Sequence, residues 1–216
     1  ALNAASVIFL PEKGDARQAL ARLRRDICER HIKDHDYRVV PFDVPAREKP
    51  PSGYAKSIED WRGKVARVYE RLLSGALAED ETGAFLVWGD PALYDGTMRI
   101  LDGIRAKGEI DVEYEVIPGI SSVQALAARH RVPLNRVGGS VTITTGRRLA
   151  QGCPEDAGSV VVMLDNEMAF TALEDGDLDI HWGAYVGTPD EILVSGKLGE
   201  VAGEIERART AAAPAP

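Results

Sequence analysis

Short apolar runs mark the positions of predicted strands along the first half of the chain. Residues 7–10, 37–40, 84–88 and 112–117 each have the length of a strand, and turn-forming or charged residues lie near their ends. The run at 84–88 is entirely apolar, which is typical of a strand that is covered on both faces.

Longer segments between these runs carry apolar residues every three or four positions, which is helical spacing. The expected inner faces of three helices are Ala16, Leu20, Leu23 and Ile27; Trp61, Val65, Tyr69 and Leu72; and Met98, Leu101 and Ile104. Residues 41–52 contain four prolines and are predicted to form a loop. The alternation of strands and helices favours a parallel sheet covered by helices.

The pattern changes at Pro118-Gly119. A helix of small residues is predicted at 121–130, and strands with short links dominate after it. These strands are predicted at 141–145, 159–164, 180–186 and 192–195, followed by a helix at 198–209 and a low-complexity, disordered tail. We therefore predict an α/β fold in two domains, residues 1–118 with a parallel sheet and residues 119–216 with a mixed sheet.

Composition and net charge limit the classes of molecule that the protein is expected to bind. The chain has 216 residues, 44% of them hydrophobic, and a formal net charge of -8. Such an acidic surface disfavours nucleic acid and anionic membranes, and an anionic ligand would need a local cluster of Arg or Lys. Two cysteines, Cys28 and Cys153, form neither a disulfide framework nor zinc-ligand spacing, so we expect reduced thiols in a cytoplasmic protein. No apolar run approaches the ~18 residues of a membrane span.

The first motif with chemical meaning is the segment from Gly89-Asp90-Pro91 to Thr97. It follows a predicted buried strand, and open α/β sheets bind ligands beyond the carboxyl ends of their strands. Gly89 would let the backbone approach a ligand closely. The alternative is a plain strand-to-helix turn in which Asp95 or Thr97 caps the next helix.

A second motif begins at Pro118-Gly119, where a strand is predicted to end and Ser121 to cap the small-residue helix. Small side chains allow close packing of either a cofactor or a neighbouring domain. Further along, a strand is expected to deliver Thr145 and the paired Arg147 and Arg148 to its carboxyl end. Arginine forks bind carboxylates in a bidentate manner, although a solvated turn would have the same sequence.

In this order the motifs resemble those of the tetrapyrrole methylase family. That family has a GDP loop, a PG-[ISV]-[ST]-S helix start, a PL segment, a T-[GR] strand and a late G-T-P-[DE]-[EQ] turn. The resemblance covers roughly residues 84–202. The phrases VWGDPALYDGTMRIL, VIPGISSVQALAARHRVPLNR, ITTGRRL and WGAYVGTPDEILVSG look most like the members that convert precorrin-5 to precorrin-6A.

One feature of the family is not found. Family members open with a strand and a GxGxGDP loop, and no such loop precedes Val7. We expect either that the sequence omits about one βα unit or that the protein is shortened, which would put catalysis in doubt.

The resemblance implies two α/β domains with S-adenosylmethionine in the cleft between them, and a homodimer. The residues implied to contact the cofactor are Gly89, Asp90, Leu93, Tyr94, Ser121, Ser122, Leu164, Ala184, Tyr185 and Pro189. The family substrate is an anionic tetrapyrrole, for which Arg99, Arg147 and Arg148 are the candidate carboxylate partners.

The implied reaction methylates carbon 1 and releases the extruded acetyl group as acetate. Methyl transfer from an activated sulfonium depends mainly on alignment, whereas attack of water on the acetyl carbonyl needs a base. Asp90 and Tyr94 are the candidate catalytic residues, and His130 and His181 are alternatives. Asp90 could instead simply hold the loop or the cofactor.

Two other functional hypotheses are compatible with the sequence. A methylase of the same fold could act on another tetrapyrrole, a protein side chain or ribosomal RNA, although the charge of -8 weakens the RNA version. A shortened, non-catalytic member could bind a ligand or partner. An NAD-type Rossmann enzyme is disfavoured, since no GxGxxG follows a predicted strand.

Overall fold

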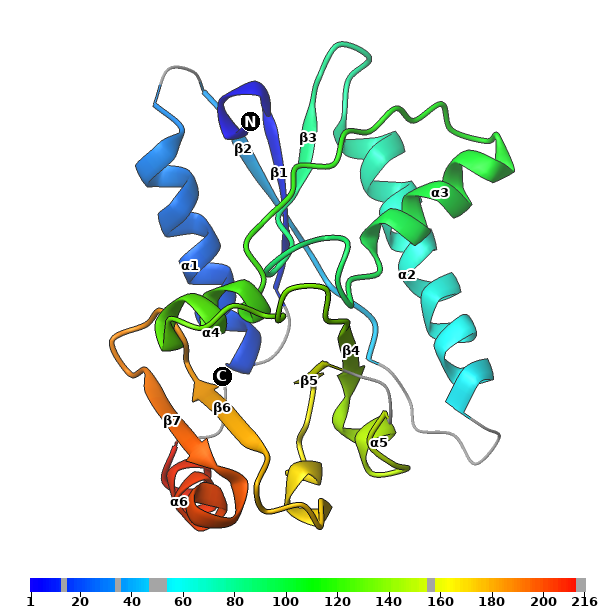
Figure 1. Cartoon of the computed structure of the whole chain (residues 1–216). Helices are drawn as coiled ribbons and strands as arrows, with labels where there is room; N and C mark the ends of the chain where they lie inside the picture. Colours follow the sequence, from blue (N-terminus) through cyan, green and yellow to red (C-terminus); the bar gives the residue numbers. More distant parts are fainter. Residues whose placement is uncertain (13–14, 34–35, 47–53, 155–157, 213–216) are drawn as a thin grey trace. The chain divides into compact units, whose positions relative to one another are not determined.

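The computed structural model describes residues 1–12, 15–33, 36–46, 54–154 and 158–212. The chain divides into two compact units, Ala1–Gly119 and a second that begins at Ile120, and each is described by itself (Figure 1). Much of the predicted 41–52 loop and the last residues of the tail lie outside the described residues.

The first unit is built on a parallel sheet of three strands. Strand β1 (Val7–Pro11) lies in the centre, between β2 (Arg38–Phe42) and β3 (Gly83–Phe85). Val7 pairs with Arg38 on one side and with Gly83 on the other. The 3-10 turn η1 (Leu2–Ala4) precedes β1, and the helices are α1 (Asp15–His31), α2 (Tyr54–Ala76) and α3 (Thr97–Lys107).

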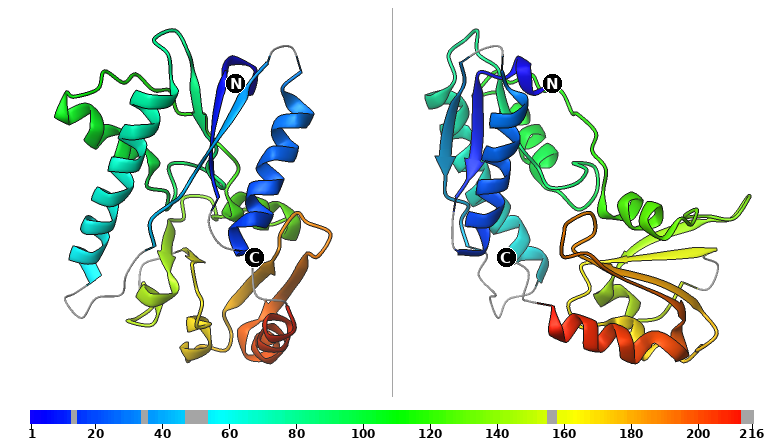
Figure 2. Two further views of the ribbon diagram at one scale, coloured as in Figure 1. Left: turned by 180° about the vertical axis from the view of Figure 1, so that it is seen from behind. Right: turned by 90° about the vertical axis from the view of Figure 1, so that its left-hand side faces the viewer.

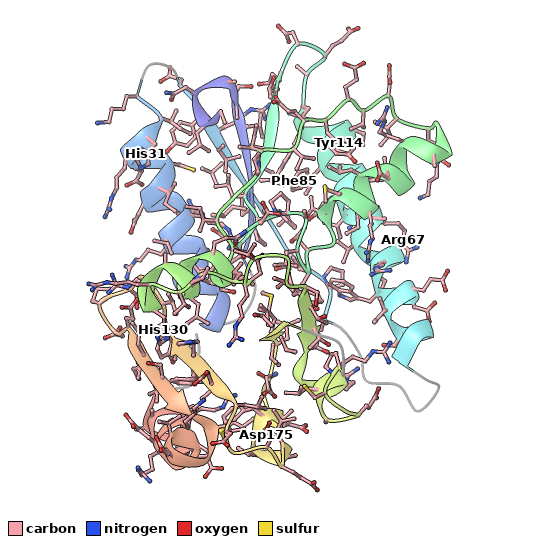
Figure 3. The ribbon with its side chains drawn as sticks, viewed as in Figure 1. His31, Arg67, Phe85, Tyr114, His130 and Asp175 are labelled. Carbon is pink, nitrogen blue, oxygen red and sulfur yellow. The ribbon has the colours of Figure 1, made fainter. Side chains whose placement is uncertain are left out.

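Helices cover both faces of this sheet, with α1 on one side and α2 and α3 on the other (Figures 1 and 2). Alternate residues of β1 face the helical layers on the two sides of the sheet. Ile8 packs with Cys28 of α1, whereas Phe9 stacks on Phe85, 4.6 Å between ring centroids. Phe85, which Figure 3 labels, in turn stacks on Tyr69 of α2 at 4.3 Å. Burial on both faces explains why β1 is a continuous apolar run.

The second unit combines parallel and antiparallel pairs of strands. Strands β4 (Val141–Thr145) and β5 (Ser159–Met163) are parallel, and β6 (Asp179–Ala184) and β7 (Ile192–Lys197) are antiparallel. The helical segments are α4 (Ser122–His130), α5 (Gly146–Leu149), η2 (Ala169–Ala172) and α6 (Leu198–Ala211). The core gathers Leu149, Phe170, Val194, Leu198 and Ile205. The predicted α/β class, with a parallel sheet in the first unit and mixed strand directions in the second, is confirmed.

Three predictions from the sequence were wrong in detail: the buried face of α1, the end of the strand at 84–88 and the strand at 112–117. The inner face of α1 is Ala21 and Cys28, while Leu23 and Ile27 are exposed. The helix is therefore rotated from the predicted phase, and its partly buried Arg24 donates to the backbone carbonyl of Leu86.

The predicted strand 84–88 ends at Phe85, and Trp88 is 61% exposed. The chain leaves the sheet there because the carbonyl of Leu86 accepts a hydrogen bond from Arg24 rather than from a strand. Similarly, residues 112–117 form no strand in the described part of the chain. Val112 and Tyr114 pack on the α2–α3 cluster, and the Tyr114 hydroxyl donates to Asp102 of α3 at 2.6 Å, so this segment is tied to a helix.

Candidate functional site

The loop between β3 and α3, residues 86–96 (the GDP loop), is organised by the carboxylate of Asp90. Its Oδ1 accepts the N–H of Ala92 and its Oδ2 accepts the N–H of Gly119, each at 2.8 Å. The N–H of Leu93 also donates to the Asp90 carbonyl oxygen at 3.1 Å. Asp90 therefore joins the two sequence motifs, which lie 29 residues apart along the chain.

Two glycines make this junction possible. Gly89 has a φ of 76°, which places it in the left-handed region that favours glycine. A Cβ at Gly119 would lie 2.2 Å from the carbonyl oxygen of Gly89, so only glycine fits there without a shift of the GDP loop. The close approach of the two backbones thus requires the Gly residue of each motif.

Three non-glycine residues of the predicted cofactor set lie in the left-handed region, as do Arg131 and Met168 outside that set. Tyr94 in the GDP loop, Leu164 directly after β5 and Tyr185 directly after β6 have φ values of 56°, 53° and 51°. Tyr94 is 50% exposed and Leu164 is 67% exposed, so burial of the side chain does not account for either. Such strain costs about 1–3 kcal/mol per residue and clusters at ligand-binding sites. All three residues belong to the predicted cofactor set.

The start of α4 is fixed by a capping box, as the sequence predicted for Ser121. The Ser121 hydroxyl accepts the N–H of Val123 at 3.2 Å, and Gln124 Oε1 accepts the N–H of Ser121 at 3.0 Å. Ser121 is 3% exposed, whereas Ser122 is exposed. Ser122 is therefore the accessible member of this predicted pair.

The carboxyl ends of β4 and β5 meet at Gly146 and Asp165. A Cβ at Gly146 would lie 2.2 Å from Asp165 Oδ1, and Asp165 Oδ2 accepts the N–H of Ala169 at 2.8 Å. Sequence reasoning missed Asp165, because its role is to fold the chain after Leu164 rather than to form a motif. Its short carboxylate bonded to local backbone N–H groups is a common turn device that could have signalled it.

The end of β6 and the turn after it are held by Glu191. Its carboxylate accepts two hydrogen bonds from Arg129 Nε and one from the N–H of Gly187 at 2.7 Å. Arg129 and these bonds hold the pKa of Glu191 below its ordinary value. The half-buried Ala184 and Tyr185 precede this turn, and Pro189 is exposed within it. The sequence did not reveal the Arg129–Glu191 pair, which joins α4 to the turn.

Comparison with known proteins places these features in a family. The family model for tetrapyrrole (corrin/porphyrin) methylases matches residues 1–202. A precorrin-6A synthase [deacetylating] from Sinorhizobium sp is 52% identical over 212 residues, covering 98% of this chain and 81% of that protein. The chain belongs to the tetrapyrrole methylase family.

Solved structures agree with this assignment. A cobalamin synthesis related protein (CobF) from Corynebacterium diphtheriae has a TM-score of 0.74 at 29% identity, over 97% of this chain and 83% of that one. A uroporphyrin-III-C-methyltransferase from Thermus thermophilus has a TM-score of 0.53 at 20% identity, over 94% and 75%. The second similarity is one of fold alone.

The three arginines predicted to bind carboxylates of the substrate are divided between the two units. Arg99 is exposed on α3 of the first unit, and Arg147 and Arg148 are exposed on α5 of the second. Arg148 also donates to Gln151 Oε1 at 3.4 Å. The structure brings Arg147 and Arg148 together on one short helix and places Arg99 in a different unit.

The alternative bases, His130 and His181, form a packed pair in the second unit. The ring centroid of His130, which Figure 3 labels, is 5.1 Å from that of His181, and His130 Nε2 lies 3.0 Å from the carbonyl oxygen of Trp182. Burial, with a smaller effect of His130, lowers the pKa of His181. Because the pair connects α4 to β6, packing accounts for both histidines.

Within the described residues, no helix is long and apolar enough to span a membrane. These residues also contain no group of three or more His, Cys, Asp or Glu residues placed to hold a metal ion.

Proposed function

We propose that this tetrapyrrole methylase converts precorrin-5 to precorrin-6A, by S-adenosylmethionine-dependent methylation of carbon 1 with loss of the acetyl group as acetate. The observation that carries the proposal is the 52% identity, over 98% of the chain, to a precorrin-6A synthase [deacetylating]. The joined GDP and PG motifs support the class of reaction, because a methyl transferase must fix the relative positions of donor and acceptor.

The proposed cofactor residues are Gly89, Asp90, Leu93, Tyr94, Ser121, Ser122, Leu164, Ala184, Tyr185 and Pro189. Apart from Ser121 and Ser122 at the start of α4, they lie in the GDP loop after β3, directly after β5, or at and after the end of β6, and the carboxyl ends of strands are where open α/β sheets bind ligands. Two features support a cofactor at these residues: the close approach of Gly89 and Gly119, and the left-handed backbone at Tyr94, Leu164 and Tyr185. A simple turn would require neither of them. S-adenosylmethionine would supply the activated methyl group.

The GDP loop would contribute to catalysis through Asp90 and Tyr94 in different ways. Each oxygen of Asp90 already accepts a backbone N–H, so we assign it the task of holding the loop. Tyr94, half exposed on a strained backbone, is the proposed group that positions the water attacking the acetyl carbonyl. Cleavage of the bond to carbon 1 would release acetate and a proton and leave the electron pair of the bond on that carbon, which would take the methyl group and leave S-adenosylhomocysteine.

The remaining parts of the proposal concern partners. Arg99, Arg147 and Arg148 would pair with carboxylates of the anionic tetrapyrrole. We further propose that the two compact units are separate domains, and that the protein acts as a cytoplasmic homodimer without nucleic-acid or membrane partners. The net charge of -8 supports the exclusion of anionic polymers and surfaces.

The direct test supplies precorrin-5 and S-adenosylmethionine carrying an isotopically labelled methyl group. We expect one labelled methyl in the product for each acetate released, measured by mass spectrometry and an acetate assay. Tyr94→Phe, which keeps the ring and removes the hydroxyl, should slow acetate release by about 100-fold, the lower range for loss of acid–base assistance. Methyl transfer without acetate would contradict the proposal, as would the absence of both.

A further inference from the structure

Arg24 of α1 lies at the carboxyl edge of the first unit's sheet. Its Nε donates to the carbonyl oxygen of Leu86 at 2.9 Å, directly after β3 and at the start of the GDP loop. Arg24 is partly buried, unlike Arg22 on the same helix, which is exposed. This edge is where open α/β sheets bind their ligands.

The opposite layer lies near the other end of the same loop. Tyr69 of α2 lies near Thr97, the first residue of α3, whose side chain opposes the rise that burial causes in the pKa of Tyr69. Arg24 also opposes that rise, so it lies near the phenol. Arg24 thus reaches past the end of β3 toward the α2 layer, and Tyr69 lies near the residue that follows the loop.

The charge of Arg24 has no carboxylate partner in the part of the chain that the structure describes. Burial lowers the pKa of its guanidinium, and the neighbouring group that acts on it is the phenol of Tyr69. By contrast, the more exposed Arg25 and Arg38 form ion pairs with Glu12 and Glu81. A partly buried cation is normally paired, and a guanidinium has further N–H donors besides Nε.

We propose that Arg24 binds a carboxylate of a ligand at this edge, held by its Nη groups while Nε remains on Leu86. The inference rests on the proposed function, whose two ligands both carry carboxylates: the side chains of the tetrapyrrole and the amino-acid end of S-adenosylmethionine. It differs from the roles of Arg99, Arg147 and Arg148, which are exposed on helices. Because Arg24 also contacts the first residue of the GDP loop, ligand binding and loop position are coupled.

The test compares Arg24→Gln and Arg24→Lys with Arg22→Gln, a matched loss of one charge from an exposed site of the same helix. The readouts are KM for precorrin-5, kcat, and the Kd of S-adenosylhomocysteine by calorimetry. Loss of a charge-assisted pair should raise one of the two binding constants by about 10- to 100-fold in Arg24→Gln. Arg24→Lys keeps the charge without the fork, so it should recover part of that loss, while Arg22→Gln should match the wild type.

The readouts separate the two carboxylate sources and a merely structural role. A rise in KM assigns the tetrapyrrole, and a rise in the Kd of S-adenosylhomocysteine assigns the cofactor. If Arg24→Gln lowers Tm but leaves both constants at wild-type values, the inference is overturned. NMR of the guanidinium N–H groups in the wild-type protein gives a second test, because they must shift when one of these ligands is added.

Failure of the proposed function has a different signature. A wild-type protein that neither binds S-adenosylhomocysteine nor converts precorrin-5 would remove the proposed function, and the inference with it. An active wild type with an unaffected Arg24→Gln variant overturns the inference alone.

Discussion

Both units hold the loops after their strands with carboxylates bonded to backbone N–H groups, but they place the strained residues differently. In the first unit Asp90 bonds to Ala92 and Gly119, and the strained Tyr94 lies within the GDP loop rather than directly after β3. In the second unit Asp165 bonds to Ala169, and the residues directly after β5 and β6, Leu164 and Tyr185, are both in the left-handed region. The second unit therefore places its strained residues at the strand ends themselves.

The two units also differ in how their strands are covered. Residues 7–10 of β1 are almost completely buried between two helical layers, so the central strand of the first unit is packed on both faces. In β4 of the second unit, Val141 and Ile143 remain exposed. Strain at Leu164 persists because the surrounding turn over-determines it, with Asp165 bonded to the N–H of Ala169 and packed against Gly146.

The largest effect should come from Gly119→Ala. The new Cβ would meet the Gly89 carbonyl oxygen at 2.2 Å, so the GDP loop must move. We expect a stability loss of about 1–3 kcal/mol, as for overpacking, and at least a tenfold (~1.4 kcal/mol) weaker affinity for S-adenosylhomocysteine. Chemical denaturation and calorimetry measure the two effects.

Gly103→Ala is the matched control for that substitution. Gly103 lies within α3, and a Cβ there has no neighbour within 4 Å. Alanine should therefore stabilise the helix by about 0.5–1 kcal/mol and leave binding unchanged. Equal effects of the two substitutions would show that the Gly89–Gly119 approach is unimportant.

A smaller effect is expected at Leu164, where glycine and alanine can be compared. Both substitutions remove the exposed side chain, but only glycine relieves the left-handed backbone. Leu164→Gly should be more stable than Leu164→Ala by about 1 kcal/mol. Both should bind S-adenosylhomocysteine more weakly than the wild type if the side chain contacts the cofactor. Wild-type affinity in both variants would remove Leu164 from the site.

The smallest effect concerns the histidine pair of the second unit. The pKa of His181 is lowered in the folded state, chiefly by burial and then by His130, with Asp179 opposing the shift. Protonation therefore favours the unfolded state, so this contribution to stability is present above the ordinary histidine pKa and is lost as the pH falls below it. Denaturation at pH values of about 7.5 and 5.5 should show a smaller loss in His181→Gln than in the wild type. An identical loss in both proteins would exclude His181 as the cause.

Sequence reasoning predicted the elements whose pattern is local. The apolar run of β1, the spacing of Val65 and Tyr69 in α2, and the Ser121 cap are each decided by neighbouring residues. It failed where a distant partner decides the outcome. In α1 the partly buried Arg24 bonds to Leu86, and in the segment 112–117 Val112 and Tyr114 pack on the α2–α3 cluster instead of forming a strand.

The same distinction applies to the candidate site. Gly89 and Asp90 could be found because a glycine and an acidic turn residue after an apolar run are visible in sequence. The hydrogen bond from Gly119 to Asp90 could not be predicted, because it joins residues 29 positions apart. The strain at Tyr94, Leu164 and Tyr185 was also hidden, because none of them is a residue that favours positive φ.

Calorimetric titration with S-adenosylhomocysteine tests the central claim most directly, when the wild type is compared with Asp90→Ala and Asp102→Ala. Asp102 is a matched carboxylate of the same unit that accepts one hydrogen bond, from Tyr114, away from the GDP loop. The account predicts micromolar binding, about -8 kcal/mol, in the wild type and Asp102→Ala, and clearly weaker binding in Asp90→Ala. Absence of binding by the wild type, or equal binding by all three proteins, would contradict it.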